Sequence, residues 1–375
     1  MIETATNKVL LGCLGSQIPE GIESIGNKAF QYSKIQSISL PQSLKVIGDY
    51  AFESASLRYL EIPSSVTSIG SNAFFGLSNL KVCKVKCQTP PKVSEYDFGE
   101  VSENTKLIVP NGQKDTYKSA AGWNCFKNIL EESEYQLSRT VNVATAGTLS
   151  SLIPESEWND FEELVLTGQL NNDDMKFIRE NLCSYSSGNV HILDMTNARM
   201  ENDVFAQDAL RASYNLEEVK LPNTLKEVQR WTFWDSGLKK IVIPKSVTEM
   251  GSDVFYQCQN LASIVVEDGN PIFDSRENCN AIIETATNTL RIGCRSTVVP
   301  SSVVAIGAYA FSGVQGLTSV DLPDGVTSIG DGAFWDDKGL TSVYLSKSIA
   351  ELGVGPFVAC SNIKTFAIDP ENPVY

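Results

Sequence analysis

The chain has 375 residues, of which 42% are hydrophobic and 20% are charged, a composition typical of an ordered protein. Its formal net charge of −15 arises from 45 acidic and 30 basic residues, so binding to the phosphate backbone of nucleic acids is not expected. Apolar runs are short and interrupted by Ser, Gly or Pro, and this excludes membrane insertion.

A repeat of 22 or 23 residues begins near the amino terminus. Pro19, Pro41 and Pro63 lie 22 residues apart, and a Phe recurs at the same spacing. The frame returns further along the chain, first at 22-residue and then at 23-residue spacing. The recurring Phe residues of these two stretches are Phe30, Phe52, Phe74, Phe311, Phe334 and Phe357. A fixed period of this length indicates a solenoid of stacked units.

One unit, from Leu317 to Gly339, illustrates the pattern L-x-x-V-x-L-P. Val320 and Leu322 alternate with polar neighbours, as in a strand with one face on a core. Pro323 cannot donate a ladder hydrogen bond and is expected to end the strand. A returning segment follows, in which we expect Gly330 to take a positive φ. Its inward side chains are predicted to be Val326, Ile329, Ala333 and Phe334.

A single unit cannot bury its own apolar face, so the units must stack. Equivalent strands then form a parallel sheet with a spacing of roughly 4.8 Å. The Phe of each unit is expected to pack on the Phe of the next. The predicted fold is an α/β repeat solenoid of the leucine-rich type with a parallel β-sheet, in two arrays separated by cap segments.

The frame is interrupted at residues 86–133, which we interpret as a C-terminal cap of the first array. This segment contains Pro90–Pro91 and a strand around Leu107–Pro110. It ends in a group of large apolar residues, of which the last three fall at near-helical spacing. The group consists of Tyr117, Trp123, Phe126 and Ile129.

Residues 134–200 follow a different pattern, which we interpret as an N-terminal cap of the second array. Strands are predicted at Val141–Val143, Leu164–Leu166 and Val190–Met195. A helix is predicted at Asp173–Leu182, with Asp173 near its N-cap. The expected domains are therefore 1–133 and 134–375.

The two ends of the chain match internal segments. Ile2–Asn7 is identical to Ile283–Asn288, and Gly12–Cys13 matches Gly293–Cys294. Asp369–Tyr375 parallels Asp268–Phe273. We therefore expect open outer faces, which indicate either a longer array or head-to-tail association of molecules.

Candidate chemistry is sparse. The single histidine, His191, lies in the apolar strand VHILDM and is expected to be structural. No catalytic motif occurs, so we predict that the protein is not an enzyme. Among the nine cysteines, Cys258 and Cys360 are expected to be buried filler, while a disulfide between Cys279 and Cys294 remains open.

Three acidic loops offer oxygen ligands: Asn171–Asp174, Glu267–Asn270 and Asp369–Asn372. None has EF-hand spacing, so solvated turns are favoured over calcium sites. No cofactor is predicted, and calcium remains the one alternative.

A candidate partner-binding surface follows from residues that vary while the interior stays constant. Tyr and Trp at outward positions provide contact area with few rotamers to freeze. Trp234 and Trp335 directly follow the Phe of their units, where packing between repeats is the alternative interpretation. The outward strand positions are Ser37, Tyr59, Glu61, Lys84, Glu218, Lys220, Lys240, Ser319, Asp321 and Tyr344.

Three motifs together resemble the BspA-like leucine-rich repeat proteins over nearly the whole chain. They are the register IPSSVTSIGSNAF, the insertion NPIFDSRENCNAIIETATN and the segment VNVATAGTLSSLIPE. The resemblance implies an extracellular or cell-surface solenoid of Bacteroides-type and other host-associated microbes. It also implies binding to host proteins, such as the matrix proteins fibronectin or fibrinogen, and no catalytic residues. No signal peptide is visible in this chain.

The leading hypothesis is accordingly a non-catalytic extracellular binding or adhesion protein that recognises a protein partner through the solenoid surface. One alternative is a structural or self-assembling spacer array. Another is a carbohydrate-binding module in which Trp234 or Trp335 stacks on sugars.

Overall fold

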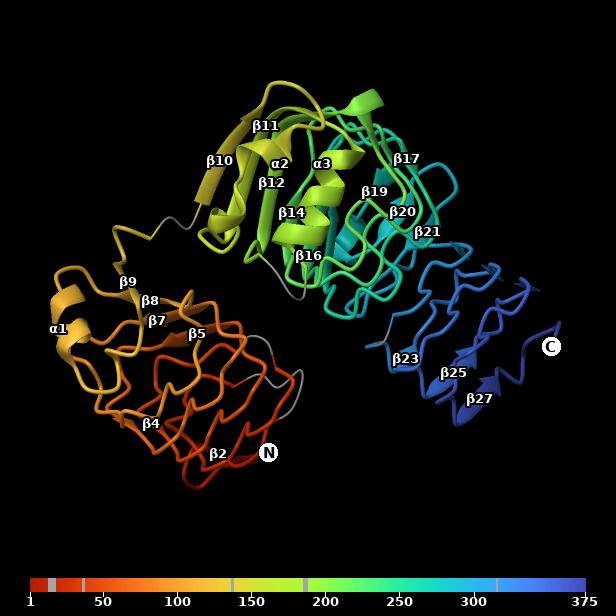
Figure 1. Cartoon of the computed structure of the whole chain (residues 1–375). Coiled ribbons are helices and arrows are strands. Elements are labelled where there is room, and N and C mark those ends of the chain that lie inside the picture. The colour runs from red at the N-terminus through yellow and green to blue at the C-terminus, as the bar shows by residue number, and fades with distance from the viewer. Residues whose placement is uncertain (13–17, 36–37, 136–137, 185–187, 315) are drawn as a thin grey trace. The chain divides into compact units, whose positions relative to one another are not determined.

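The computed structural model describes residues 1–12, 18–35, 38–135, 138–184, 188–314 and 316–375. The chain forms two compact units, Met1–Gln136 and Leu137–Tyr375. Each unit is a stack of β-coils joined by parallel strands (Figure 1). The two units are described separately below.

The first unit contains two sheets and one helix. One sheet is parallel and consists of β5 (Tyr59–Ile62), β7 (Val82–Val85), β8 (Lys106–Val109) and β9 (Asn128–Glu131). The other sheet consists of β1 (Ile2–Glu3), β2 (Lys8–Val9), β3 (Ser24–Ile25), β4 (Val46–Ile47) and β6 (Ser68–Ile69). Helix α1 covers Lys114–Ser119.

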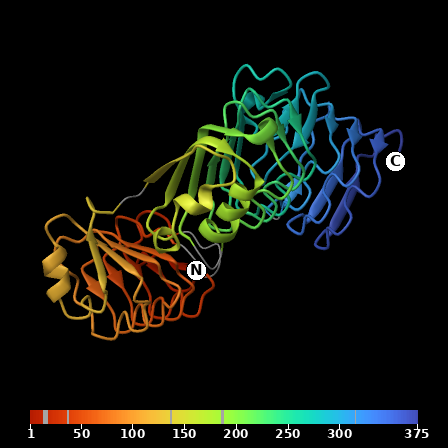
Figure 2. The same cartoon turned by 45° about the horizontal axis from the view of Figure 1, so that its top comes forward.

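The second unit contains two sheets of six strands and two of three. The first large sheet is parallel and consists of β10 (Ser138–Val143), β11 (Glu163–Leu170), β12 (Ile192–Met200), β14 (Glu218–Lys220), β16 (Lys240–Ile243) and β18 (Ser263–Val266). The second consists of β19 (Phe273–Asp274), β20 (Ile282–Glu284), β21 (Thr289–Ile292), β22 (Ala305–Ile306), β24 (Ser328–Ile329) and β26 (Glu351–Leu352). One small sheet consists of β13 (Val204–Phe205), β15 (Glu227–Val228) and β17 (Glu249–Met250). The other consists of β23 (Ser319–Val320), β25 (Ser342–Leu345) and β27 (Thr365–Ile368). Figure 2 shows the successive coils of this unit from green to blue.

Two sides of each coil are strands, and the inward residues match the predicted pattern. On β5, Leu60 and Ile62 are buried, whereas Tyr59 and Glu61 are only half-buried. The returning segment, predicted only as a packed stretch, carries a second strand of two residues such as β6. A strand of two residues is too short to show an alternation of apolar and polar side chains. The sequence therefore did not predict the second sheet.

The third side carries the predicted column of stacked Phe rings, which is confirmed. In the first unit, ring centroids are 5.1 Å apart for Phe30 and Phe52, and 5.7 Å apart for Phe52 and Phe74. In the second unit, Phe334 stacks at 5.1 Å on Phe311 and at 5.2 Å on Phe357. Rings at this separation contribute beyond the area that they bury.

The residues on either side of each Phe give this third side its own hydrogen bonds. Tyr50 and Ser54 flank Phe52 and both have positive φ values, 55° and 51°. The backbone N–H groups of Tyr50, Phe52 and Ser54 therefore point the same way and donate to the next coil, at 3.0, 2.8 and 2.8 Å. All three sides of a coil thus bond to the neighbouring coil, and few backbone groups stay unpaired.

The expected positive φ at Gly330 is wrong, because this glycine serves a different purpose. Its φ is not in the left-handed region, and a Cβ there would lie 2.6 Å from the backbone N of Ala308 and 2.8 Å from the carbonyl carbon of Gly307. Gly48 and Gly70 are equally crowded by the preceding coil. The glycine column therefore allows close approach of backbones rather than an unusual turn.

Residues 86–133 continue the coil architecture. Phe98 extends the Phe column, with its ring 5.0 Å from that of Phe74. The near-helical spacing of Trp123, Phe126 and Ile129 does not reflect a helix: the first two lie after α1, and Ile129 is on β9. Their spacing arises because Trp123 and Phe126 both pack on Phe98, while Ile129 follows the alternation of a strand.

In residues 134–200 the three predicted strands correspond to β10, β11 and β12. The predicted helix is α3 (Asn172–Phe177), followed by a wider helical turn at Ile178–Leu182. Its N-cap is Asn171 rather than Asp173, because the Asn171 side chain accepts from the N–H groups of Asp173 and Asp174 in a capping box. Helix α2 covers Leu149–Leu152.

In the described part of the chain, α-helix occurs only in α1, α2 and α3. Three-residue helical turns at Glu155–Glu157, Glu201–Asp203 and Arg276–Asn278 add little. The fold is therefore a parallel β-solenoid of stacked coils, and the predicted α/β character applies only to the segments 86–133 and 134–200.

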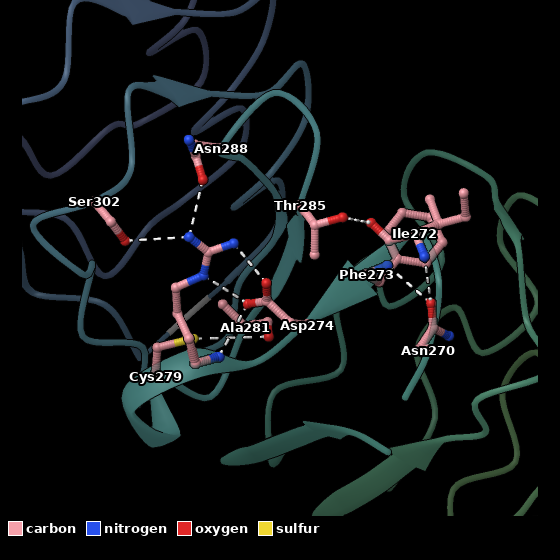
Figure 3. A network of polar contacts seen from close by, with 10 residues as sticks. Asn270, Ile272, Phe273, Asp274, Cys279, Ala281, Thr285, Asn288 and Ser302 are labelled. Atoms are coloured by element: carbon pink, nitrogen blue, oxygen red, sulfur yellow. Dashed lines mark hydrogen bonds and ion pairs between the residues drawn. The ribbon is translucent and has the colours of Figure 1, made fainter. Parts of the chain in front are cut away.

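An insertion at residues 268–294 replaces part of one coil by a hairpin. Asn270 fixes its start, because its Oδ1 accepts from the N–H groups of Ile272 and Phe273. Asp274 and Asn288 are linked through Arg276, whose Nε lies 2.8 Å from Asp274 Oδ1 (Figure 3). Hydrogen bonds thus hold both ends of the insertion.

The segments at the two chain ends that match the insertion in sequence also have the same local structure as the insertion. β1 pairs antiparallel with β2, as β20 pairs with β21. Asn372 accepts from Val374 and Tyr375 N–H groups, as Asn270 does within the insertion. Cys279 and Cys294 are free thiols, so the disulfide left open is not formed. Ser37 and Cys13 lie outside the described residues.

Candidate binding surfaces

The outer face of the six-stranded parallel sheet carries a row of ion pairs. Lys220 on β14 lies 2.8 Å from Asp194 on β12 and 3.5 Å from Glu163 on β11. Lys240 on β16 lies 2.9 Å from Glu218 on β14. Because the strands are parallel and in register, equivalent outward positions fall side by side and opposite charges meet across neighbouring strands.

The charges of this row are stabilised by their partners. A hydrogen bond to Asp194 raises the pKa of Lys220. Burial would raise the pKa of Asp194, but hydrogen bonds from Lys220 and Thr196 outweigh it, so the pKa lies below its usual range. Both groups are therefore charged over the whole neutral pH range.

A shallow hollow of about 290 Å³ opens on this face between β12, β14 and β16. Its lining includes Lys220, Lys240, Glu218 and Val242. Val242 and its cross-strand partner Val265 are 45% and 43% exposed. This volume lies at the lower end of the range for small-molecule pockets, and it is sufficient for a protruding side chain of a partner.

The predicted residues of the first unit are largely engaged. Tyr59 packs against Val82, Ile108 and Tyr135, and its hydroxyl donates to Glu61 at 3.1 Å. Lys84, whose side chain is only 16% exposed, pairs with Glu132 at 3.3 Å. Glu61 pairs with Lys86 at 2.7 Å. The chain that follows β9 covers this face. The repeat period of the sequence does not predict this contact.

The sheet of β23, β25 and β27 carries the remaining outward residues. Asp321 and Ser319 are exposed. Tyr344 on β25 is 47% exposed, and its hydroxyl donates to Asp369 at 2.6 Å. These residues offer an accessible but shallow surface.

Trp234 and Trp335 lie on a different side of the coils. Each follows a buried Phe of the third side, Phe233 and Phe334. Trp335 is 39% exposed, and Trp234 is partly buried. The predicted surface residues therefore fall on separate faces, and those that line the hollow are Glu218, Lys220 and Lys240.

The residues considered for chemistry have structural contacts. His191 Nδ1 lies 2.9 Å from the carbonyl oxygen of Asn215. In the acidic loops, Asp174 completes the capping box, Asn270 holds the insertion, and Asp369 accepts from Tyr344. Among the described residues, no group of three or more His, Cys, Asp or Glu is placed to hold a metal ion.

The profile of the BspA-type leucine-rich repeat region matches residues 15–129, 178–287 and 289–373. The chain therefore belongs to the BspA-type leucine-rich repeat family. No curated protein matches it. No helix in the described parts of the chain has the length and apolarity needed to cross a membrane.

Solved structures of bacterial leucine-rich repeat proteins are similar to this chain. One from Eubacterium ventriosum is 17% identical, with a TM-score of 0.36, and the match covers 92% of this chain and 60% of that one. A leucine-rich cell surface protein from Faecalibacterium prausnitzii is 16% identical, with a TM-score of 0.32 and coverage of 98% and 92%. One from Bacteroides ovatus is 22% identical, with a TM-score of 0.28 and coverage of 95% and 86%. The chain thus spans under two thirds of the Eubacterium protein.

Proposed function

We propose that this chain is a non-catalytic extracellular or cell-surface protein that binds a protein partner through the outer face of the β10–β18 sheet. The observation that carries the proposal is the hollow between Lys220, Lys240 and Val242. The hollow combines an exposed apolar side chain, Val242, with charged side chains, and protein interfaces likewise combine apolar and charged groups. Matrix proteins such as fibronectin or fibrinogen are the proposed partners.

Surface plasmon resonance with immobilised fibronectin and fibrinogen tests this proposal. Val242→Asp places a new charge in the hollow, and Lys240→Glu reverses a charge that lines it. Both variants should bind more weakly than the unaltered chain, because an unpaired charge in a desolvated contact is costly.

Lys347→Glu provides the matched control, since Lys347 is similarly exposed but lies away from the hollow and pairs with Glu371. It should bind as the unaltered chain does. If Val242→Asp and Lys240→Glu also bound an identified partner normally, the proposed face would be the wrong one.

We further propose that residues 86–133 and 134–200 act as caps of the two arrays.

As a second candidate function, the chain is a self-assembling spacer. Exposed apolar side chains on the last coil, Val354 at 82% and Phe366 at 49%, favour this candidate. Sedimentation velocity between low and high concentration tests it: head-to-tail species should grow with concentration, and Val354→Asp with Phe366→Ser should abolish them.

A further inference from the structure

A strip of aromatic residues runs along the third side of the second unit. It consists of Trp231, Trp234, Tyr256, Tyr309 and Trp335, which immediately follow or closely precede the buried residues of the Phe column. The rings of Trp231 and Trp234 are 5.7 Å apart, those of Trp234 and Tyr256 are 6.0 Å apart, and those of Tyr309 and Trp335 are 6.0 Å apart. The Tyr256 hydroxyl donates to Asp336 at 2.9 Å and so joins the two groups of rings.

The coil itself does not require these aromatics. In the first unit, the positions that follow Phe30 and Phe52 carry Gln31 and Glu53, which hydrogen-bond to each other. Those coils stack with the same Phe column and the same backbone bonds. In the third coil of that unit Phe75 follows Phe74, so the position accepts an aromatic residue but does not require one. The run of aromatic residues over successive coils of the second unit therefore needs another explanation.

The surroundings of the strip are polar and carry no excess of positive charge. Arg211 lies over Trp234 at 4.5 Å, and Arg230 lies over Trp231 at 4.0 Å. Arg230 also pairs with Asp253 at 3.0 Å, and Arg211 lies 4.0 Å from Asp208. Both guanidinium groups are thus partly neutralised, which disfavours a sulfated or phosphorylated ligand.

Carboxylate and amide groups border the rings. Gln257 accepts from the Trp234 indole N–H at 3.2 Å, and its own amide donates to Asp336 at 3.3 Å. Asp235 accepts from the Tyr214 hydroxyl at 3.1 Å. Arg211 and Arg230 cover one face of Trp234 and Trp231, whereas Trp335 is 39% exposed. An exposed ring beside polar groups suits a pyranose, whose C–H face stacks on the ring while its hydroxyls form hydrogen bonds.

We propose that this aromatic strip binds a neutral glycan chain along the axis of the solenoid. Successive coils are spaced at roughly 4.8 Å. This spacing is close to the advance of one sugar along an extended chain, so one sugar meets each coil. Trp335, the most exposed ring of the strip, provides the main stacking platform. This site is separate from the sheet face proposed for the protein partner.

The test uses affinity gel electrophoresis of the full chain with soluble neutral polysaccharides (xyloglucan, mixed-linkage β-glucan and yeast mannan) and with heparin as a sulfated comparison. At least one neutral polysaccharide should retard the native chain. Trp335→Ala should weaken that binding about tenfold, the usual scale for losing one stacked ring. Trp335→Gln, which copies the polar residue of the first unit, should do the same without disturbing the fold.

Tyr344→Ala is the matched control, because Tyr344 is a similarly exposed aromatic on another face. It should bind the glycan normally, and so should Lys240→Glu from the sheet face. Retention by heparin alone, no retardation by any neutral polysaccharide, or normal binding by both Trp335 variants would each overturn the proposal. Circular dichroism melting checks that every variant is folded.

Discussion

At the scale of single residues, a buried carboxyl group departs from the repeat. The third residue after each Phe is small or apolar in most coils, such as Ser236 or Cys258, but after Phe334 it is Asp337. Asp337 is fully buried, and only its Oδ1 has partners, the N–H groups of Gly339 and Leu340. Its Oδ2 has no hydrogen bond. Burial raises the pKa of Asp337 to about 7.

We predict that Asp337 makes the second unit less stable at alkaline than at mildly acidic pH. Its folded-state pKa lies above the ordinary 3.8, so the unfolded chain releases the proton first. The stabilisation is complete below pH 3.8 and is lost as the pH rises through about 7, with a slope of up to about 1.4 kcal/mol per pH unit. Urea unfolding between pH 4 and 8 measures this slope.

Asp337→Asn should flatten the pH dependence, because the side-chain carbonyl still accepts from both N–H groups but the side chain cannot ionise. Asp321→Asn, at an exposed acid, should leave the dependence unchanged. An unaltered slope in Asp337→Asn would contradict this assignment.

At the scale of elements, close backbone approach determines how coils stack. A glycine follows several of the short strands of the second side and lies directly against the preceding coil, as Gly330 lies against Ala308 and Gly307. Two residues further on, the backbone enters the left-handed region, where Gly332 has a φ of 55° and Asn72 of the first unit has a φ of 54°. Gly330 is therefore required for close backbone approach, whereas Gly332 is at a position that needs a positive φ.

Gly330→Ala should therefore destabilise the second unit strongly, by about 1–3 kcal/mol or more, because the new methyl group overlaps backbone atoms that cannot move aside. Gly332→Asn should cost less, since Asn72 already holds the equivalent left-handed position and the atoms nearest to the new Cβ, at 2.6 Å, belong to the side-chain ring of Tyr309 and not to backbone. Thermal unfolding of both variants measures the difference. Equal losses of stability would show that the coils are not in the close contact described.

At the scale of the whole molecule, strand pairing and ring stacking join neighbouring coils, and the chain forms two compact units. Stability in such an array is the sum of local terms. Damage to one unit is therefore expected to leave the other intact.

Phe52→Ala should cost the first unit about 3–5 kcal/mol, the usual loss for a buried Phe. Phe52 is fully buried between two stacked rings, so the cavity cannot close easily. Hydrogen exchange followed by mass spectrometry should show faster exchange around residues 44–80 and unchanged protection in β10–β18. Gln31→Ala, at a half-buried position of the same coils, is the control and should lose only the hydrogen bond to Glu53. Faster exchange throughout the second unit would contradict independent behaviour.

The candidate surfaces could be predicted from the sequence only in part. Lys220 and Lys240 could be placed on one face because equivalent strand positions recur with the repeat. The contact between Tyr59 and Tyr135 could not be predicted from the sequence. It depends on the chain folding back over the sheet at a point outside the repeat. Phe98 was missed as a member of the Phe column because its coil is 24 residues from Phe74 and breaks the frame.

The amino-acid sequence by itself determined the coil: its length, its inward side chains and its Phe column. These features follow from local spacing, since alternation and period are written along the chain. The tertiary structure alone decided why Gly330 is glycine, which outward charges are paired, and that Trp234 and Trp335 share a strip with Tyr256. The physical reason is that each of these depends on contacts between residues one or more coils apart, and such contacts exist only once the coils have stacked.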